Sequence, residues 1–226
     1  MKRLIPFLFM FFLGLACIHS AESQTNPSLN SQYQQYLGTF RINPKSDGLK
    51  GTPFLFDVPP LGKIGLEGGK DYSEIPFNIL LDKNEVYIQT GGEDSEPLLL
   101  RNWEWIEVPG EEVRRFKMEY LQGKPQLVEI LFEKDGEKYI ASHKKTLIRP
   151  SGQRDGYSGP QYDTFRHDIK YFKIKGMQST EIKTNSAGLK EWAGGRNDEM
   201  KEFIKENKLD PNDPLGMKKI ITFLIN

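Results

Sequence analysis

The sequence predicts an α+β fold, in which an antiparallel, β-rich body is followed by two or three short C-terminal helices. Short apolar runs bounded by Gly and Pro recur from residue 38 to about residue 184, as strands do. An Asp-Gly pair lies between two of these runs, which is typical of a tight hairpin. Helical spacing of apolar residues follows from residue 185 onward. Because helices and strands do not alternate, a doubly wound parallel sheet is disfavoured.

The first strands of the body are expected to be short. Two apolar runs closed by Gly and Pro come first, GTFRINP and GTPFLFDVPP. Longer apolar runs flank Asp82-Lys83-Asn84, which predicts a hairpin whose second strand covers residues 85–90. The next strand is expected to carry Trp103, Trp105 and Val108 on one face.

The strongest local pattern is a second hairpin. Asp135-Gly136 is a favoured type I′ pair between two apolar runs. Residues 127–133 should therefore pair with residues 138–143. Pro150 then ends the β pattern, because proline cannot donate to a strand ladder.

A long loop follows at residues 151–163, rich in Gly, Pro, Ser and Asp. Loops of this length are uncommon unless they are functional or connect separate parts. Its side chains Arg154, Tyr157 and Tyr162 form a candidate ligand-binding surface, since tyrosine and arginine suit adaptable contacts. The alternative is a connector between the β body and the helical end.

Three helix starts are predicted after the last strand. Ser186 is the expected N-cap of the first, and Asn197 or Asp198 that of the second. Asp213 should cap the third helix, with Pro214 at its first position. Apolar stripes at helical spacing are expected to face the core, at Met200, Phe203, Ile204 and Leu209 and at Leu215, Ile220, Phe223 and Leu224.

The first residues predict export. MKR is a positive start, and an apolar run of fifteen residues follows, LIPFLFMFFLGLACI. We therefore expect a signal peptide at residues 1–21, a polar tether at residues 22–37 and a single α+β domain at residues 38–226. The localisation expected is exported: periplasmic, outer-membrane-anchored or secreted, with no transmembrane span after signal removal.

Cys17 is the only cysteine among 226 residues and has two expected fates. It is either acylated as the first residue of a lipoprotein or discarded with the signal peptide. Ala16 fits a lipidation box, whereas Gly14 and Leu15 fit it poorly. Cleavage after Ser20, Ala21 or Ser23 is the alternative. In both cases no disulfide forms within the mature chain.

The composition argues against several classes of function. Lys plus Arg and Asp plus Glu both number 31, so no net charge recruits nucleic acid. We expect no metal and no cofactor, because His143 and His167 are too few for a zinc site without cysteine. His143, next to two lysines, is expected at the surface. Asp168 should point away from His167, because neighbours on a strand face opposite ways.

Two long stretches carry a resemblance to a known group of proteins. The N-terminal one is LKGTPFLFDVPPLGKIGLEGGKDYSEIPFNILLDKNEVYI, and the C-terminal one runs from YDTFRHDIKYFKIKG to KEFIKENKLDPNDPLGMKKIITFLIN. Together they cover over half of the expected domain at residues 38–226 and resemble small exported proteins common in Bacteroidota, whose function is unassigned. The resemblance implies export and a similar fold, and it supplies no catalytic residue. Pro76-Phe77 stand where that pattern usually has an Arg-Tyr pair.

Together these patterns predict a non-enzymatic exported protein of the bacterial envelope. It would act through binding or a structural role, with an unknown envelope protein or a glycan as partner. The alternative is a glycan-directed envelope hydrolase with a carboxylate pair. Glu104 and Glu107 would be its acids, because sugars stack on tryptophans such as Trp103 and Trp105.

Overall fold

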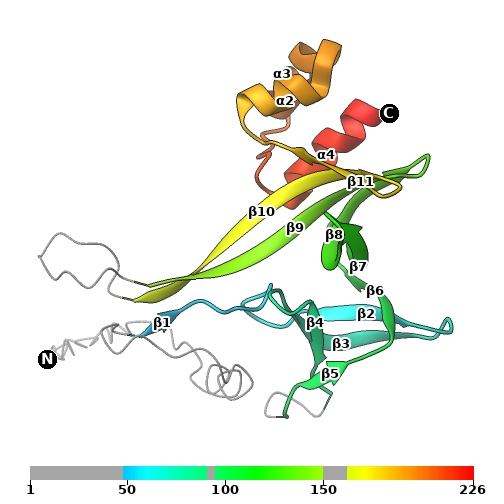
Figure 1. Ribbon diagram of the computed structural model, residues 1–226, viewed down its shortest axis with the longest axis vertical. Helices are drawn as coiled ribbons and strands as arrows, with labels where there is room; N and C mark the ends of the chain where they lie inside the picture. The colour runs from blue at the N-terminus through cyan, green and yellow to red at the C-terminus, as the bar shows by residue number, and fades with distance from the viewer. Residues whose placement is uncertain (1–47, 91–94, 150–161) are drawn as a thin grey trace, which may run out of the picture. The chain divides into compact units, whose positions relative to one another are not determined.

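The computed structural model describes residues 48–90, 95–149 and 162–226 (Figure 1). In these residues the class is α+β, as predicted, with a sheet of eleven strands followed by a helical C-terminal region. All of them belong to one compact unit, residues 40–226. The predicted signal peptide, the tether and Cys17 lie outside the described residues, as do Arg154 and Tyr157.

The strands follow one another along the chain before the helices begin. In order they are β1 (Leu49–Lys50), β2 (Leu61–Leu66), β3 (Asp71–Leu80), β4 (Glu85–Ile88), β5 (Leu98–Leu100), β6 (Trp103–Val108), β7 (Arg114–Leu121), β8 (Lys124–Lys134), β9 (Glu137–Ile148), β10 (Asp163–Lys175) and β11 (Gln178–Ile182). The helical region contains α2 (Ser186–Ala193), the 3₁₀ turn η1 (Gly194–Arg196), α3 (Asn197–Glu206) and α4 (Pro214–Ile225). None of the helices in the described part of the chain is long and apolar enough to cross a membrane.

The strands pair in the order β1-β10-β9-β8-β7-β6-β2-β3-β4-β5, with β11 added to β10. All described pairs are antiparallel except β1 with β10, which is parallel over two residues. The sequence patterns predicted a purely antiparallel body, and the parallel pairing of β1 with β10 is an exception to that prediction. This short parallel contact joins two segments far apart in the chain.

Both predicted hairpins are confirmed. Strands β3 and β4 pair around the turn that begins after Leu80. Strands β8 and β9 pair around Asp135-Gly136, whose φ angles of 52° and 76° are both positive, as a type I′ turn requires.

The prediction that Trp103 and Trp105 share a face is wrong. Trp103 packs with Val108 against a buried cluster, whereas the indole of Trp105 lies over Gly65 on the other face. The cause is an irregular register between β2 and β6, where Gly65 pairs with Trp105 but the next residue pairs with Trp103. A bulge of this kind breaks the two-residue alternation of a strand.

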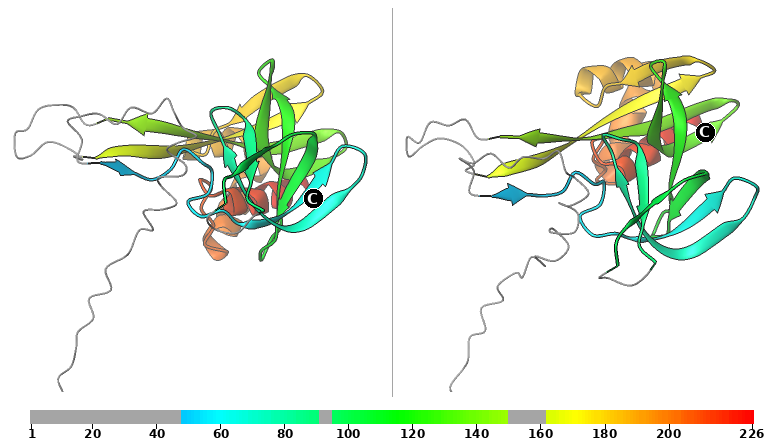
Figure 2. Two further views of the ribbon diagram at one scale, coloured as in Figure 1. Left: turned by 90° about the horizontal axis from the view of Figure 1, so that it is seen from below. Right: turned by 60° about the horizontal axis from the view of Figure 1, so that its bottom comes forward.

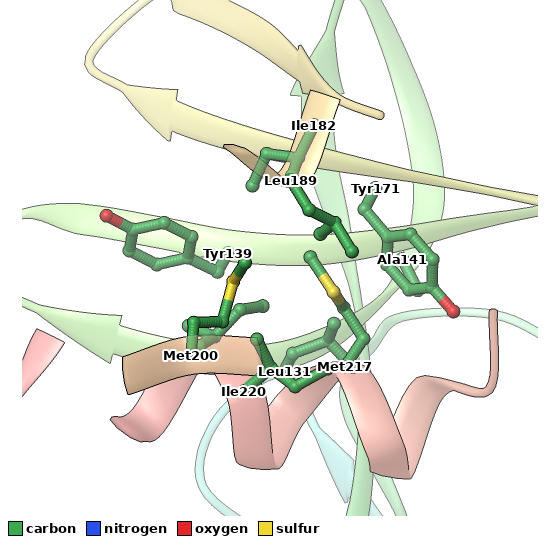
Figure 3. Packing of buried hydrophobic residues seen from close by; sticks show 10 residues of the cluster. Leu131, Tyr139, Ala141, Tyr171, Ile182, Leu189, Met200, Met217 and Ile220 are labelled. Carbon is green, nitrogen blue, oxygen red and sulfur yellow. The ribbon is translucent and has the colours of Figure 1, made fainter. Parts of the chain in front are cut away.

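Two apolar clusters lie on one face of the central strand β8. The strand cluster is built from the β body alone, and its buried members are Leu55, Ile64, Phe77, Ile79, Leu81, Val86, Ile106, Phe116 and Leu127. Burial of each such side chain contributes roughly 1.5–3 kcal/mol. The helix cluster forms where α2, α3 and α4 cover β8, β9 and β10, and its buried members are Leu131, Tyr139, Ala141, Tyr171, Ile182, Leu189, Met200, Met217, Ile220 and Ile221 (Figures 2 and 3).

The predicted stripe of α3 is confirmed, that of α4 in part, and the caps in part. On α4, Leu215 is not in the helix cluster, whereas Met217 and Ile221 are buried there. Met200 and Ile220 are buried, and the rings of Phe203 and Phe223 stack at 4.3 Å. Asp213 caps α4 by accepting from the Gly216 amide at 2.9 Å, as predicted. The cap of α2 is instead its preceding residue, Asn185.

The second helix lacks the predicted cap. Asn197 is the first residue of α3, and Arg196 stands at the cap position without a side-chain capping hydrogen bond. Its Nε donates instead to the Glu199 side chain at 3.1 Å. The turn η1 leads directly into α3, so a capping side chain is not what begins this helix. Acids in its first turn, Asp198 and Glu199, agree with the favourable charge at a helix start.

Candidate functional site

Of the predicted loop residues, the structure describes Tyr162. Its ring lies under the ammonium of Lys50, which is 3.8 Å from the ring centroid. Its carbonyl accepts a hydrogen bond from the Thr164 hydroxyl at 3.3 Å. Tyr162 is partly buried, and its ring makes a cation–π contact with Lys50 of β1.

The residues suggested for a hydrolase do not assemble into a pair of free acids. Glu107 forms an ion pair with Arg115, whereas Glu104 is exposed. Trp105 has two cations near its ring, with Lys63 Nζ at 5.6 Å and Arg115 Cζ at 5.8 Å from the centroid. A sugar stacking on this indole would compete with both.

A row of polar side chains crosses four neighbouring strands on the face that carries the two apolar clusters. It consists of Arg114 on β7, Glu129 on β8, His143 on β9 and His167 on β10, and is called the histidine row below. The strand register brings the row together diagonally. Glu129 pairs with Ala141, two residues before His143, and His143 pairs with Ile169, two residues after His167.

The four side chains form a continuous chain of hydrogen bonds. Arg114 donates to Glu129 through Nε at 2.7 Å and through its terminal nitrogen at 2.8 Å. Nε2 of His143 lies 2.9 Å from the second oxygen of Glu129, and Nδ1 of His143 lies 3.1 Å from Nε2 of His167. The side chains of Glu129 and His143 are each 2% exposed, while His167 reaches the surface.

The row has a place between the clusters. Along β8, Leu127 belongs to the strand cluster and Leu131 to the helix cluster, and Glu129 lies between them. The ring of His143 also lies 6.4 Å from that of Phe116 in the strand cluster. A buried carboxylate at this seam requires partners, because an unpaired buried charge is costly.

The electrostatics of the row keep Glu129 ionised. Burial alone would raise the pKa of Glu129, but hydrogen bonds from Arg114 and His143 outweigh it and hold the pKa at about 2. Burial likewise opposes the charge of Arg114, yet the bonds to Glu129 raise its pKa. The pKa of His167 is lowered to about 4 by desolvation and by the positive charges of His143 and Lys145.

The expectation that His143 lies at the surface is therefore wrong. His143 is 4% exposed. Neighbouring residues on β9 alternate between the two faces of the sheet, so His143 faces the core and Lys144 faces solvent. Asp168 pairs with Arg166 at 3.0 Å. The His167 imidazole is oriented by its contact with His143, which is held in turn by Glu129, and not by Asp168.

The row also fixes where protons stand. An ionised Glu129 only accepts, so Nε2 of His143 carries a proton. When both imidazoles are neutral, Nδ1 of His143 accepts from Nε2 of His167. Nδ1 of His167 then carries a lone pair. It makes no hydrogen bond among the residues that the structure describes.

A second feature lies on the other side of the sheet. A hollow of about 240 Å³, called the outer hollow below, is lined by Leu61, Gly62, Lys63, Ser73, Glu74, Glu107, Pro109 and Val113. The neighbouring Ile64 belongs to the strand cluster, so alternation turns Leu61 and Lys63 away from it. Leu61 is 52% exposed and Val113 is 49% exposed.

The outer hollow lies at a backbone irregularity. The register of β2 and β3 shifts between Gly62 and Ile64, which are partners of Ile75 and Tyr72. Glu74, within the extra residues of β3, has a φ of 58°, a conformation uncommon for a residue with a side chain. Such strained positions cluster at functional sites. The sequence did not predict a positive φ at Glu74, because this conformation is usually adopted by Gly, Asn or Asp.

No metal centre accompanies either feature. Within residues 48–90, 95–149 and 162–226, no group of three or more His, Cys, Asp and Glu side chains is placed to hold a metal ion. The chain matches no family model, no curated protein and no solved structure. The resemblance to exported Bacteroidota proteins therefore stays a prediction from sequence motifs.

Proposed function

We propose that the protein is an exported, non-enzymatic component of a bacterial envelope that acts by binding a protein partner at the outer hollow. The observation that carries this proposal is the exposed apolar lining of the hollow beside Glu74, a carboxylate without a partner among the described residues. Leu61 and Val113 are both about half exposed on one surface. Exposed apolar side chains that gather at a concave site are typical of interaction surfaces.

The charge at the hollow defines the partner further. Glu107 is neutralised by Arg115, and Lys63 is paired with Asp71 at 2.7 Å. Glu74 is exposed and makes no hydrogen bond or ion pair with any other described residue. The outer hollow thus suits a polypeptide that inserts an apolar side chain and places a lysine or arginine against Glu74.

A protein partner fits better than a glycan. Sugar recognition needs an open aromatic face, and Trp105 has Lys63 and Arg115 beside its ring. The lining of the hollow offers few polar groups free to bind hydroxyls, because two of its three charged residues are already paired.

The non-enzymatic part of the proposal is supported by how the carboxylates are used. Both oxygens of Glu129 accept hydrogen bonds, and its low pKa of about 2 keeps it from donating a proton. Glu107 is held by Arg115. The glycan-directed hydrolase stays the alternative, and hydrolysis of purified peptidoglycan or envelope polysaccharide that Glu107→Gln abolishes would establish it.

Export is supported by the first residues of the sequence, MKR followed by LIPFLFMFFLGLACI. The intact mass of the protein isolated from its own cells tests this proposal. A chain starting at Cys17 with acyl groups would show a lipid anchor on Cys17. A start at Ala21, Glu22 or Gln24 would show a cleaved secretory signal, and an unprocessed chain would contradict export.

The docking site is tested by site-specific photo-cross-linking in cells. A benzophenone side chain at Leu61 should capture one protein partner, and the same group at Met177 should not. Met177 is a matched control because it is 96% exposed on the turn between β10 and β11. The captured protein should then bind in purified form.

The charge prediction sharpens this test. Glu74→Lys should abolish capture by the Leu61 probe, and Glu133→Lys, an equally exposed change on β8, should not. Replacing the contacting lysine or arginine of the partner by glutamate should restore binding to Glu74→Lys. Equal capture from Leu61 and Met177, or no effect of Glu74→Lys, would contradict the proposed docking site.

A further inference from the structure

Lys145 on β9 has a largely covered side chain and one distant ion-pair partner among the described residues. Its side chain is 10% exposed, and its ion-pair partner among the described residues is Asp57 at 3.7 Å. That distance is too long for a hydrogen bond, and the Asp57 side chain is 80% exposed. Lys145 Nζ makes no hydrogen bond in the described part of the chain. The stem of Lys145 is thus largely covered, whereas its ammonium keeps three donors that no described acceptor takes up and that can bind an anion.

His167 lies directly across from Lys145. The two residues are register partners on β9 and β10, so their side chains project on the same face. Nε2 of His167 is engaged with His143, which leaves Nδ1 for an outside group. An exposed imidazole and the ammonium of a largely covered lysine therefore lie on the same face at the end of the histidine row.

Counting protons shows what an anion would require. With both imidazoles neutral, the pair holds two N–H protons, one donated to Glu129 and one shared between His143 and His167. Nδ1 of His167 is then a lone pair and repels an anion. A third proton on Nδ1 turns it into a donor. The shared proton can then shift onto His143, whose imidazolium is held by Glu129.

We propose that Lys145 and His167 form a binding site for a small oxyanion, of the phosphate or carboxylate class, and that the anion binds together with one proton. The anion accepts from the Lys145 ammonium and from Nδ1–H of His167. The proton comes from solvent and is retained by the imidazole pair. This site is separate from the outer hollow and does not depend on the function proposed for it.

The charges around the pair agree with this coupling. Arg114 on β7 and Lys145 on β9 oppose the third proton, while Glu129 on β8 and Asp168 on β10 favour it. Desolvation, followed by the positive charges of His143, Lys145 and Arg114, outweighs Asp168 and lowers the pKa of His167. Two further carboxylates act indirectly. Asp57, before β2, interacts with Lys145, and Asp213, at the start of α4, interacts with Arg114. An anion reverses the balance by screening Lys145.

Calorimetric titration of the full chain with sodium sulfate tests the site, at constant ionic strength adjusted with NaCl. Sulfate is a suitable probe because it stays fully ionised between pH 5 and 8, so any proton taken up belongs to the protein. Binding in two buffers of different ionisation enthalpy should show uptake approaching one proton. Affinity should rise by up to about tenfold for each unit of falling pH. Phosphate and acetate, titrated in parallel, distinguish a tetrahedral oxyanion from a carboxylate.

Variants locate the binding. Lys145→Met and His167→Gln should each weaken sulfate binding at least tenfold, and His167→Gln should also remove the proton uptake. Lys144→Met is the matched control, since this neighbouring lysine is exposed on the opposite face of β9, and it should change affinity less than twofold. In the unaltered chain, sulfate should raise the pKa of His167 measured by NMR, a readout that does not require a variant to fold.

Three results would overturn the proposal. They are sulfate binding without proton uptake, equal effects of Lys144→Met and Lys145→Met, and a His167 titration that sulfate does not move. Any of these would identify the sulfate effect as general screening of surface charge.

Discussion

The histidine row and the outer hollow lie in the same sheet but treat their polar groups in opposite ways. In the row, each charged group is paired, and Glu129 accepts three hydrogen bonds while buried. At the hollow, Glu74 is exposed with no described partner, beside half-exposed Leu61 and Val113. Satisfied, buried groups hold a fold together, whereas unsatisfied, exposed ones are available for binding. Substitutions should therefore affect stability in the row and association at the hollow.

The largest expected effect on stability comes from Glu129. Glu129→Leu leaves Arg114 and His143 without their buried acceptor, and we expect a loss of about 3–5 kcal/mol in the free energy of unfolding. Urea denaturation monitored by tryptophan fluorescence measures it. Glu181→Gln, which removes an exposed ion pair with Lys170, should cost less than about 1 kcal/mol.

A double variant distinguishes pairing from packing. Arg114→Met combined with Glu129→Leu removes both charges, and replacing a whole buried ion pair by apolar side chains is often close to neutral. The double variant should therefore be more stable than Glu129→Leu alone. If it is less stable, the row contributes through its shape and His143 rather than through compensation of charge.

A smaller effect is expected at Gly65, where β2 pairs with β6. A Cβ atom at Gly65 would lie 2.2 Å from the ring of Trp105, so Gly65→Ala must displace the indole. We expect a loss of about 1–3 kcal/mol, the usual cost of overpacking. Gly195→Ala is the control, because nothing lies within 4 Å of its added carbon. A shift in tryptophan emission that accompanies the loss in Gly65→Ala alone would locate the change at Trp105.

The pH dependence of stability separates the two regions further. His167 has a folded-state pKa of about 4, below its usual 6.5, so folding favours its neutral form. Its contribution is present above pH 6.5 and is lost as the pH falls toward 4. Glu129, with a pKa of about 2 against the usual 4.5, adds a second loss between pH 4.5 and 2.

Urea midpoints measured from pH 8 to pH 3 check both steps. His167→Gln should flatten the step between pH 6.5 and 4 and leave the lower one. Glu74→Gln at the hollow should leave both steps in place. A profile of His167→Gln that matches the unaltered chain would show that the row does not control the upper step.

The elements that sequence predicts well are those whose cause is local. Asp135-Gly136 sets its own turn, and the spacing of Met200, Phe203 and Ile204 alone identifies the buried side of a helix. The α+β class follows from such local patterns. Helix caps are less certain, since Asn185 and Ser186 are both good caps and only the backbone decides between them.

The sites depend on register, which the sequence does not display. Glu129 and His143 are 14 residues apart and His143 and His167 are 24 apart, so only the pairing of β8, β9 and β10 brings them together. One irregular pairing at Gly65 likewise reversed the expected face of Trp105. The alternation of His143 with exposed Lys144 was the one available signal, and the two lysines that follow His143 obscured it.

The smallest expected effect on stability is the one that most directly tests the role of the hollow. Leu61→Asp should change the free energy of unfolding by no more than about 0.5 kcal/mol, because the side chain is 52% exposed. It should nevertheless abolish partner capture by a benzophenone placed at Val113, since a carboxylate would enter an apolar contact. Urea denaturation and cross-linking on the same variant measure the two effects. A variant that also loses stability would show that Leu61 contributes to folding. Capture that persists in a stable variant would show that the partner does not bind at the outer hollow.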